Sequence, residues 1–348
     1  MLVPYEYVPH QMERMQEFIN FIFDVWCSAP SGAPYSLNLY NGNPDLKEIM
    51  TAFHYADTQI ADFYSSNIEA IYRHFSQLDQ GQIDQLRLWF DANNQIEAAC
   101  SDKDLQIARY AEVEALDANL AAALRKFFTG IYDKVGAADL VQKIGTISAH
   151  HDAFVLVNNF GKCPFCGLSD LKGEYHEKRE AYDHYLPKAL YPFNSINFRN
   201  LVPTCHECNS VYKLQKDPAF GEGARRKSFF AYSAVPSDIR IKVKLASPNY
   251  ESISPDDIVF EYGPPEKTEE IATWCDLYGI DERYKAKCCG ENDGKYWVAQ
   301  VLDECANEGV TPDQLMARIR RQAEKSPLAE SNFLKKAFLE GCKEAGFF

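Results

Sequence analysis

The chain has 348 residues, of which 46% are hydrophobic and 25% charged, a composition typical of globular proteins. No apolar run approaches the roughly 18 residues that span a bilayer, and the N-terminal MLVPYEYVPH lacks the pattern of a signal peptide, so we expect a cytoplasmic protein without membrane partners. The formal net charge of −14 would disfavour nucleic acid as a ligand if it were evenly spread.

The charge is not evenly spread along the chain. Residues 1–160 carry a net −11 and residues 251–348 a net −8, whereas residues 161–250 carry +5. Local charge decides whether a phosphate backbone can dock. The basic section is therefore a candidate for contact with nucleic acid. An ordinary solvated surface explains an excess of five charges equally well.

Residues 1–157 have the apolar spacing of a helical domain. Helices are expected over residues 12–27, 43–75, 81–99 and 102–135, where apolar side chains recur every three or four positions. The aromatic residues follow the same spacing, so we interpret them as core residues rather than as a cofactor site.

Turn-forming residues at NNFGKC (158–163) mark the start of a second unit, residues 158–220. Its pattern predicts a strand over 179–184, a second strand over 200–205 and a helix over 206–216. The stretch DPAFGEG (217–223) is interpreted as a linker.

The C-terminal region, residues 221–348, is expected to form a short β-hairpin followed by helices. Alternating residues predict a strand over 238–246 that pairs with 257–262, and helical spacing returns over 267–279, 293–307, 312–324 and 329–345. The predicted fold class is mainly α with a small α+β insert, in which a central unit stapled by zinc is flanked by helical N- and C-terminal regions.

Four of the eleven cysteines form two C-x-x-C pairs, Cys163 with Cys166 and Cys205 with Cys208, separated by 38 residues. Two such knuckles can complete a closed tetrahedral site of four thiolates, so we expect a structural zinc ion with no open position for chemistry. A redox C-x-x-C fits less well because no βαβ pattern surrounds either pair. His206, inside the second knuckle, is a substitute ligand that four thiolates make unnecessary.

The segment between and after the knuckles resembles the HNH endonuclease family in its four-cysteine form. The residues that carry this resemblance read CPFC, then DHYLPK, then NFRNLVPTCHECNSVYK, and they lie within residues 161–217. The resemblance implies a ββα-metal fold for the central unit. It also implies that His184 is the general base, that Asp183 and Asn209 hold a catalytic Mg²⁺ or Mn²⁺, and that Asn200 fixes the loop and orients His184.

The residue types suit the same chemistry. A neutral imidazole can take a proton from water near pH 7, and the oxygens of Asp183 and Asn209 are ligands that Mg²⁺ accepts. Lys213 and Lys216 are expected on the helical face of Asn209, where the ammonium of Lys213 would meet the phosphate. Asn209 stands where the family name implies histidine, which leaves the identity of the metal open. A regular strand would separate the side chains of Asp183 and His184, so β-structure must end or twist there.

Further residues are candidates for contact with nucleic acid: Lys188, Lys216, Arg225, Arg226 and Lys227, together with the strand IRIKVKLA. DNA is the expected substrate and RNA an alternative. His176 is an alternative base, in the charged stretch GEYHEKREA. A different class of function also remains open, a non-catalytic zinc-dependent module that binds nucleic acid or a protein.

The acidic flanks require a role of their own, because they repel duplex DNA. HNH proteins of similar architecture occur beside ATPases in bacterial phage-defence operons such as the Septu type. The resemblance therefore implies a function in antiviral defence, with an ATPase or another defence subunit bound by the helical flanks.

Overall fold

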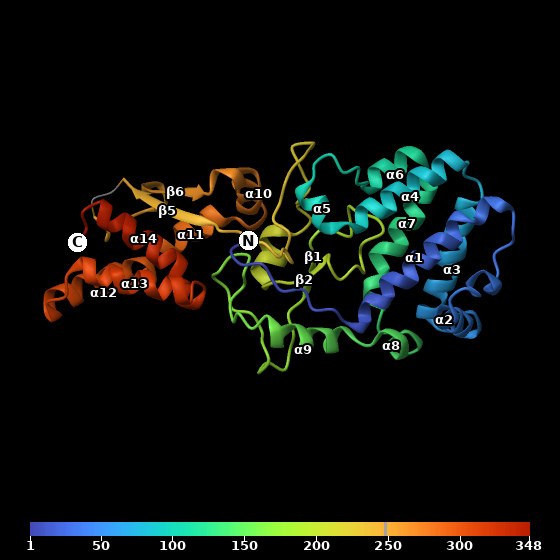
Figure 1. Ribbon diagram of the computed structural model, residues 1–348, viewed down its shortest axis with the longest axis horizontal. Coiled ribbons are helices and arrows are strands. Elements are labelled where there is room, and N and C mark those ends of the chain that lie inside the picture. The colour runs from blue at the N-terminus through green and yellow to red at the C-terminus, as the bar shows by residue number, and fades with distance from the viewer. Residues whose placement is uncertain (247–248) are drawn as a thin grey trace.

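The computed structural model of the protein describes residues 1–246 and 249–348. The molecule is elongated, with the N-terminal helices at one end, strands β1 (Tyr182–His184) and β2 (Leu201–Pro203) in the middle and the C-terminal helices at the other end (Figure 1). It is mainly helical with small antiparallel two-stranded sheets in the described residues, as the sequence predicts at this level. Within the described chain, no helix combines the length and apolar character needed to cross a membrane.

The N-terminal region contains a larger number of shorter helices than expected. They are α1 (Arg14–Cys27), α2 (Pro44–Tyr55), α3 (Gln59–Phe75), α4 (Gln80–Asn94), α5 (Ile96–Ser101), α6 (Tyr110–Leu116), α7 (Ala118–Ile131), α8 (Ala138–Ile144) and α9 (Ile147–Val157).

Capping residues divide two runs that were expected to be continuous helices. The run over 43–75 breaks after α2, because Ala56 is extended and the Thr58 hydroxyl caps α3 at the amide of Ala61. In the same way Asp117 is extended and caps α7, which separates it from α6. Residues 102–109 are not helical, and helices α8 and α9 were not predicted.

The core of the N-terminal region also receives side chains from the central unit. Phe193, in the loop between β1 and β2, lies 5.6, 5.3 and 5.5 Å from the rings of Phe23, Phe90 and Phe128. Asn93 of α4 donates to the carbonyl of Pro192 in the same loop. The loop that carries the candidate site is therefore anchored in the helical core, and the N-terminal region positions the site.

The C-terminal region consists of the predicted hairpin and five helices. The hairpin pairs β5 (Arg240–Leu245) with β6 (Ile258–Gly263). The helices are α10 (Thr268–Tyr278), α11 (Ile280–Cys289), α12 (Gly294–Glu308), α13 (Pro312–Lys325) and α14 (Asn332–Glu344). Helix α11 was not predicted; it is separated from α10 by Gly279, whose φ of 58° is accessible to glycine.

The predicted linker over 217–223 is wrong in part. Strands β3 (Phe220–Gly221) and β4 (Ala224–Arg225) form a small hairpin there, closed by the bond from the Arg226 amide to the carbonyl of Ala219.

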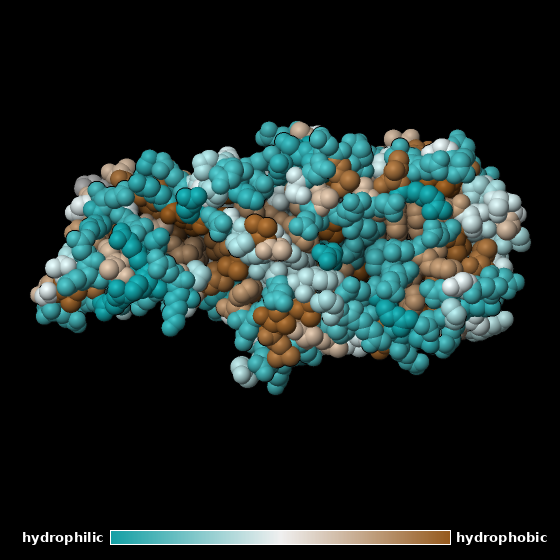
Figure 2. Space-filling model, in the orientation of Figure 1, coloured by the Kyte–Doolittle hydropathy of each residue, from teal (hydrophilic) through white to brown (hydrophobic). Residues whose placement is uncertain are grey.

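The face of the molecule in Figure 2 is mostly hydrophilic, with apolar side chains gathered over the α9 part of the surface. The exposed Leu156 and Val157 belong to this helix.

His150 of α9 links the helical region to β1, since its Nδ1 lies 2.5 Å from the hydroxyl of Tyr182. The side chain is 2% exposed, and burial together with the neighbouring His10 and His151 lowers its pKa to about 4. The unfolded chain has an ordinary histidine there, with a pKa of about 6.5. Unfolding therefore takes up a proton between these two values, so the stability that neutral His150 contributes is present above pH ~6.5 and lost as pH falls toward 4.

We expect His150→Gln to flatten the pH dependence of stability. The free energy of unfolding should fall between pH 7.5 and 5.5 by about 1 kcal/mol less in this variant than in the wild type. Urea unfolding at both pH values measures the difference. His54→Gln, at the exposed end of α2, is the matched control and should keep the wild-type slope; equal slopes in all three proteins would contradict the assignment.

Candidate active site and metal centre

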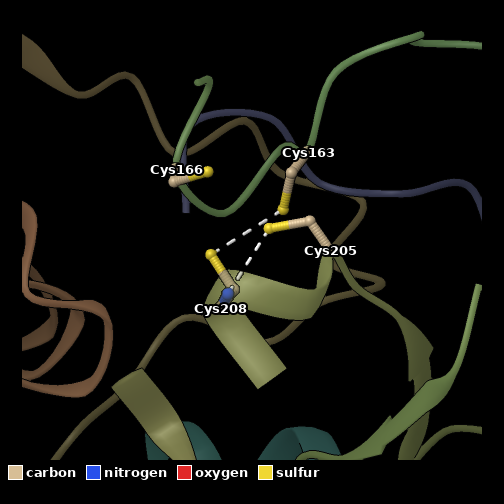
Figure 3. Close-up of side chains that lie close together, drawn as sticks. All are labelled: Cys163, Cys166, Cys205 and Cys208. Atoms are coloured by element: carbon tan, nitrogen blue, oxygen red, sulfur yellow. Dashed lines mark hydrogen bonds between the residues drawn. The ribbon is translucent and has the colours of Figure 1, made fainter. Parts of the chain in front are cut away.

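The two C-x-x-C knuckles meet in one buried cluster. The sulfur atoms of Cys163, Cys166, Cys205 and Cys208 lie within 4.8 Å of one another, and Figure 3 shows them pointing toward a common centre. The Cys163 and Cys208 sulfurs are 3.9 Å apart, close to the ~3.8 Å expected for thiolates about 2.3 Å from one zinc ion. The cluster can therefore bind zinc in a closed tetrahedral site.

Backbone and side-chain donors favour the thiolate form of Cys166 and Cys205. Burial raises the pKa of the Cys163 thiol, and hydrogen bonds within the cluster raise that of Cys208. The amides of Leu168 and Cys208 donate to the sulfurs of Cys166 and Cys205. Hydrogen bonds within the cluster, that from Cys163 first, and the charge of Arg283 hold the pKa of the Cys166 thiol well below its usual value. These donors complement the negative charge of four thiolates.

Helices α10 and α11 of the C-terminal region cover the cluster. The guanidinium of Arg283 donates to the Cys208 sulfur at 3.3 Å. The Trp274 indole donates to the carbonyl of Phe165 at 2.6 Å, and the Tyr284 hydroxyl donates to the carbonyl of Cys166 at 2.9 Å. The C-terminal region is thus docked on the first knuckle itself. Sequence analysis missed Arg283 because it lies 75 residues beyond the knuckle that it contacts.

Directly before the second knuckle, β1 (Tyr182–His184) pairs antiparallel with β2 (Leu201–Pro203), and Asp183 stands opposite Val202. A seven-residue helix, Glu207–Lys213, begins inside the second knuckle and includes Cys208. The order of strand, loop, strand and helix agrees with the predicted local pattern, but the strands are three residues each and the helix is of the π type, with a bond from the Leu214 amide to the carbonyl of Asn209. A π-turn is frequent at functional sites.

His184 closes β1, and its ring is fixed from two sides. Its Nε2 lies 2.9 Å from the carbonyl oxygen of Ser195, and the ring contacts that of Tyr132 edge-on with centroids 4.8 Å apart. A carbonyl oxygen can only accept, so Nε2 carries the proton and the neutral ring leaves Nδ1 as the acceptor. Burial, with the charge of Lys188, lowers the pKa of His184 to about 3, so the ring is neutral near pH 7.

Asp183 points to different partners from those of His184. Its carboxylate is buried, and one oxygen accepts from the ammonium of Lys213 at 3.0 Å. The second oxygen, Oδ2, is buried and has no hydrogen-bond partner within the described structure. Burial raises the pKa of Asp183, and Lys213 opposes this shift. An unpaired buried carboxylate oxygen is an acceptor that a cation can satisfy.

Lys213 lies where the sequence did not place it. Its side chain is fully buried, and the ammonium also donates to the backbone carbonyl of His184 at 3.1 Å. It therefore does not reach solvent to meet a phosphate, because Asp183 holds it inside. Lys216 does not share a helical face with Asn209 either, since the helix ends at Lys213 and Lys216 bonds to Asp276 of α10.

Asn209 lies in the first turn of the helix Glu207–Lys213, and its side chain is half-buried. In the part of the chain that the structure describes, this side chain makes no hydrogen bond. Asn200, in contrast, is fully buried and satisfied: it accepts from the Leu186 amide at 2.7 Å and donates to the Leu186 carbonyl at 3.0 Å and toward Asn194. Asn200 therefore closes the loop that presents Ser195 to His184, and it contacts the loop rather than the imidazole.

Most of the basic residues predicted to contact nucleic acid have a partner within the protein, several of them in surface ion pairs. Arg225 donates to the carbonyls of Ala99, Asp102 and Ala219, and Arg226 pairs with Asp276 at 2.7 Å. Lys188 lies near His184 and pairs with Asp133 at 3.5 Å. In the strand IRIKVKLA, Lys242 pairs with Glu344 and Lys244 with Glu261. The backbone amide of Lys227 donates a hydrogen bond to the carboxylate of Glu269.

His176 and His206 lie outside both centres. His176 is exposed and accepts from the Gly173 amide at 3.0 Å. His206 is exposed, whereas the cluster residues are buried, so the four thiolates do not need it.

Comparisons with known proteins give two partial similarities. The chain is 33% identical over 107 residues to protein ea31 of Escherichia phage lambda, covering 30% of this chain and 32% of that protein. It is 36% identical over 61 residues to Septu protein PtuB of Bacillus thuringiensis, covering 16% of this chain and 22% of that protein. The matched stretches thus span less than a third of either relative's length. No model of a protein family matches the chain, and no solved structure matches it.

Removing the charge of Arg283 should weaken metal binding at the cysteine cluster. Outer partners of metal ligands typically contribute about 10- to 100-fold in affinity, so we expect Arg283→Met to lose zinc to a chromophoric chelator at correspondingly lower chelator concentration. Arg318→Met, which removes an exposed ion pair on α13 with Glu304, is the control. Equal zinc affinity in both variants would show that Arg283 does not support the thiolates.

The Lys213–Asp183 pair predicts a strong coupling in stability. Lys213→Met leaves a buried carboxylate without its cation and should lower the free energy of unfolding by about 3–5 kcal/mol. Adding Asp183→Asn should recover part of this loss, because the uncompensated charge is then gone. Lys216→Met, at a half-exposed pair, should cost less than about 1 kcal/mol. Additive losses for the double variant, measured by urea unfolding at constant zinc, would contradict the pairing.

Proposed function

We propose that the protein is a metal-dependent HNH-type endonuclease that hydrolyses phosphodiester bonds of DNA. The observation that carries this proposal is the buried Oδ2 of Asp183, left without a hydrogen-bond partner beside a neutral histidine of fixed tautomer. Both groups lie on one three-residue strand that leads to a four-cysteine cluster, the order that the resemblance to HNH endonucleases implies.

Each residue has a defined task in this proposal. Nδ1 of His184 takes a proton from the attacking water, since Nε2 is occupied by the carbonyl of Ser195. Water adds to phosphorus, the bond to the leaving oxygen breaks, and the leaving oxygen takes up a proton. Asn200 keeps the loop closed, so the imidazole stays in place through the reaction.

Asp183 Oδ2 and the side-chain oxygen of Asn209 would hold a divalent cation, Mg²⁺ or Mn²⁺, which supplies positive charge at the scissile phosphate when bound. The unpartnered oxygen of Asp183 and the unbonded side chain of Asn209 fit such a group. Lys213 fixes the carboxylate from its other oxygen, so in this proposal it positions a ligand rather than contacting phosphate.

The similarity to Septu protein PtuB supports a role in antiviral defence, the context that the HNH resemblance suggests for proteins of this architecture. We extend the proposal to a partner, an ATPase or another defence subunit, bound by the acidic helical flanks. The net charge of −11 in residues 1–160 and −8 in residues 251–348 supports this, because these regions repel DNA and need another binding role.

The test is cleavage of a supercoiled plasmid by the purified protein in EDTA and in a series of Mg²⁺ and Mn²⁺ concentrations. His184→Ala should reduce cleavage at least about 100-fold with zinc content unchanged, because the base contributes about that much. His176→Ala removes an exposed histidine eight positions earlier and should cut like the wild type.

Cleavage by His184→Ala at the wild-type rate would overturn the catalytic assignment. Binding of DNA without cleavage in any metal would instead favour a non-catalytic zinc-dependent binding module. Labelled RNA and DNA of the same sequence, digested side by side, decide between the two substrates. A partner that proves necessary for cutting would be recognised by restoration of activity when lysate of the native host is added to the wild type but not to His184→Ala.

A further inference from the structure

Tyr132 brings the N-terminal helical region into the candidate site. It lies in the helical turn Tyr132–Lys134 that follows α7, and its ring meets the His184 ring edge-on at 4.8 Å with an interplanar angle of 79°. Nothing in its local sequence marks this residue, which lies 52 positions before the histidine. The ring of Tyr132 thus forms one wall of the space beside the proposed base.

Two cations meet at this same tyrosine. The ammonium of Lys188 lies 5.4 Å from the centre of the Tyr132 ring, and its charge also acts on His184. The positive charge of Arg179 acts on the Tyr132 hydroxyl: burial raises the pKa of this phenol, and the charge of Arg179 opposes the shift. In the sequence, residues 179 and 188 stand before and after β1, the strand that carries His184.

Arg179 differs from Lys216, Arg225 and Arg226, whose charged groups have partners within the protein. It is exposed, and within residues 1–246 and 249–348 it has no carboxylate partner; it donates only to the backbone carbonyl of Glu180 and lies 5.8 Å from the Tyr182 ring centre. Lys216 and Arg226 share Asp276, and Arg225 is bound to carbonyls. Arg179 therefore has donors available for an anion from solvent.

The ammonium of Lys188 is also available to an external anion. Its ion pair with Asp133 is 3.5 Å long, and the Asp133 side chain is 66% exposed. Exposed pairs of this kind contribute little, about 0–1 kcal/mol, and are easily exchanged for a phosphate. Arginine offers a planar fork of donors that matches phosphate oxygens, and lysine adds a point charge.

We propose that Arg179, Lys188 and the Tyr132 hydroxyl form an anion-binding wall that holds a backbone phosphodiester of DNA beside His184. This inference rests on the proposed function and adds the residues that seat the substrate. It assigns substrate binding to the stretch just before β1 and to the N-terminal region, and away from Arg225 and Arg226. The N-terminal helices would then complete the site as well as support it.

The test is the binding of a fluorescein-labelled DNA duplex, followed by anisotropy in EDTA over a series of salt concentrations. Arg179→Ala should weaken binding about tenfold and lower the slope of log K against log [salt] by about 0.9, the value for one lost phosphate contact. Lys178→Ala is the matched control, since it removes one exposed positive charge from the adjacent position without a contact to Tyr132. Tyr132→Phe keeps the ring against His184 and should weaken binding roughly two- to threefold.

Equal effects of Arg179→Ala and Lys178→Ala would overturn the inference, as would no measurable binding by the wild type at low salt. If the wild type cuts plasmid but Arg179→Ala binds and cuts like the control, the nuclease proposal stands and the anion-binding wall falls. If the wild type never cuts but Arg179→Ala still loses binding and salt slope, the wall stands in a non-catalytic binding module.

Discussion

The convergence of four cysteine sulfurs is the constraint on which the rest of the molecule depends. The hairpin of β1 and β2 has three residue pairs, too few to be stable alone, and 38 residues separate the knuckles. A metal ion bound by both knuckles would close this long loop and would hold in place the helix that contains Cys208. The first knuckle also carries the hydrogen bonds from Trp274 and Tyr284. Loss of the metal would therefore loosen the candidate site and the docking of the C-terminal region together.

A second constraint acts on β1, where consecutive side chains must face different surroundings. Asp183 turns toward Lys213 in the buried interior, and His184 turns toward Tyr132 and Ser195. The strand ends at His184, and the proposed function requires the two groups to serve one site. Burial has opposite consequences for them: it raises the pKa of the carboxyl group and lowers that of the imidazole. Lys213 opposes the rise in the pKa of Asp183, and in the proposed function the carboxylate serves a cation at its free oxygen.

The sequence predicted the parts of this site that depend on local spacing. These parts are the two C-x-x-C pairs, the paired residues of β1 and β2, and the helix that begins at Glu207. All of them follow from short motifs and lie within the ranges that the pattern predicted. It failed for contacts that depend on tertiary packing. A lysine four positions after Asn209 has the spacing of an exposed helical face, but the packing turns Lys213 inward. Arg283 and Tyr132 belong to other regions, and nothing in their local sequence marks them.

The fate of the basic residues shows why net charge by itself is a weak guide to a binding surface. Residues 161–250 carry an excess of five positive charges, yet Arg225 and Arg226 are held by carbonyls and by Asp276. Charges that are satisfied inside the fold stabilise it and attract little from solvent. The cations available to bind an anion are those that lack a carboxylate partner within the protein. Near His184, Arg179 meets this criterion. In the proposed function the acidic flanks would sharpen the same selection, because regions of net negative charge repel a phosphate backbone and leave the cations near His184 to attract it.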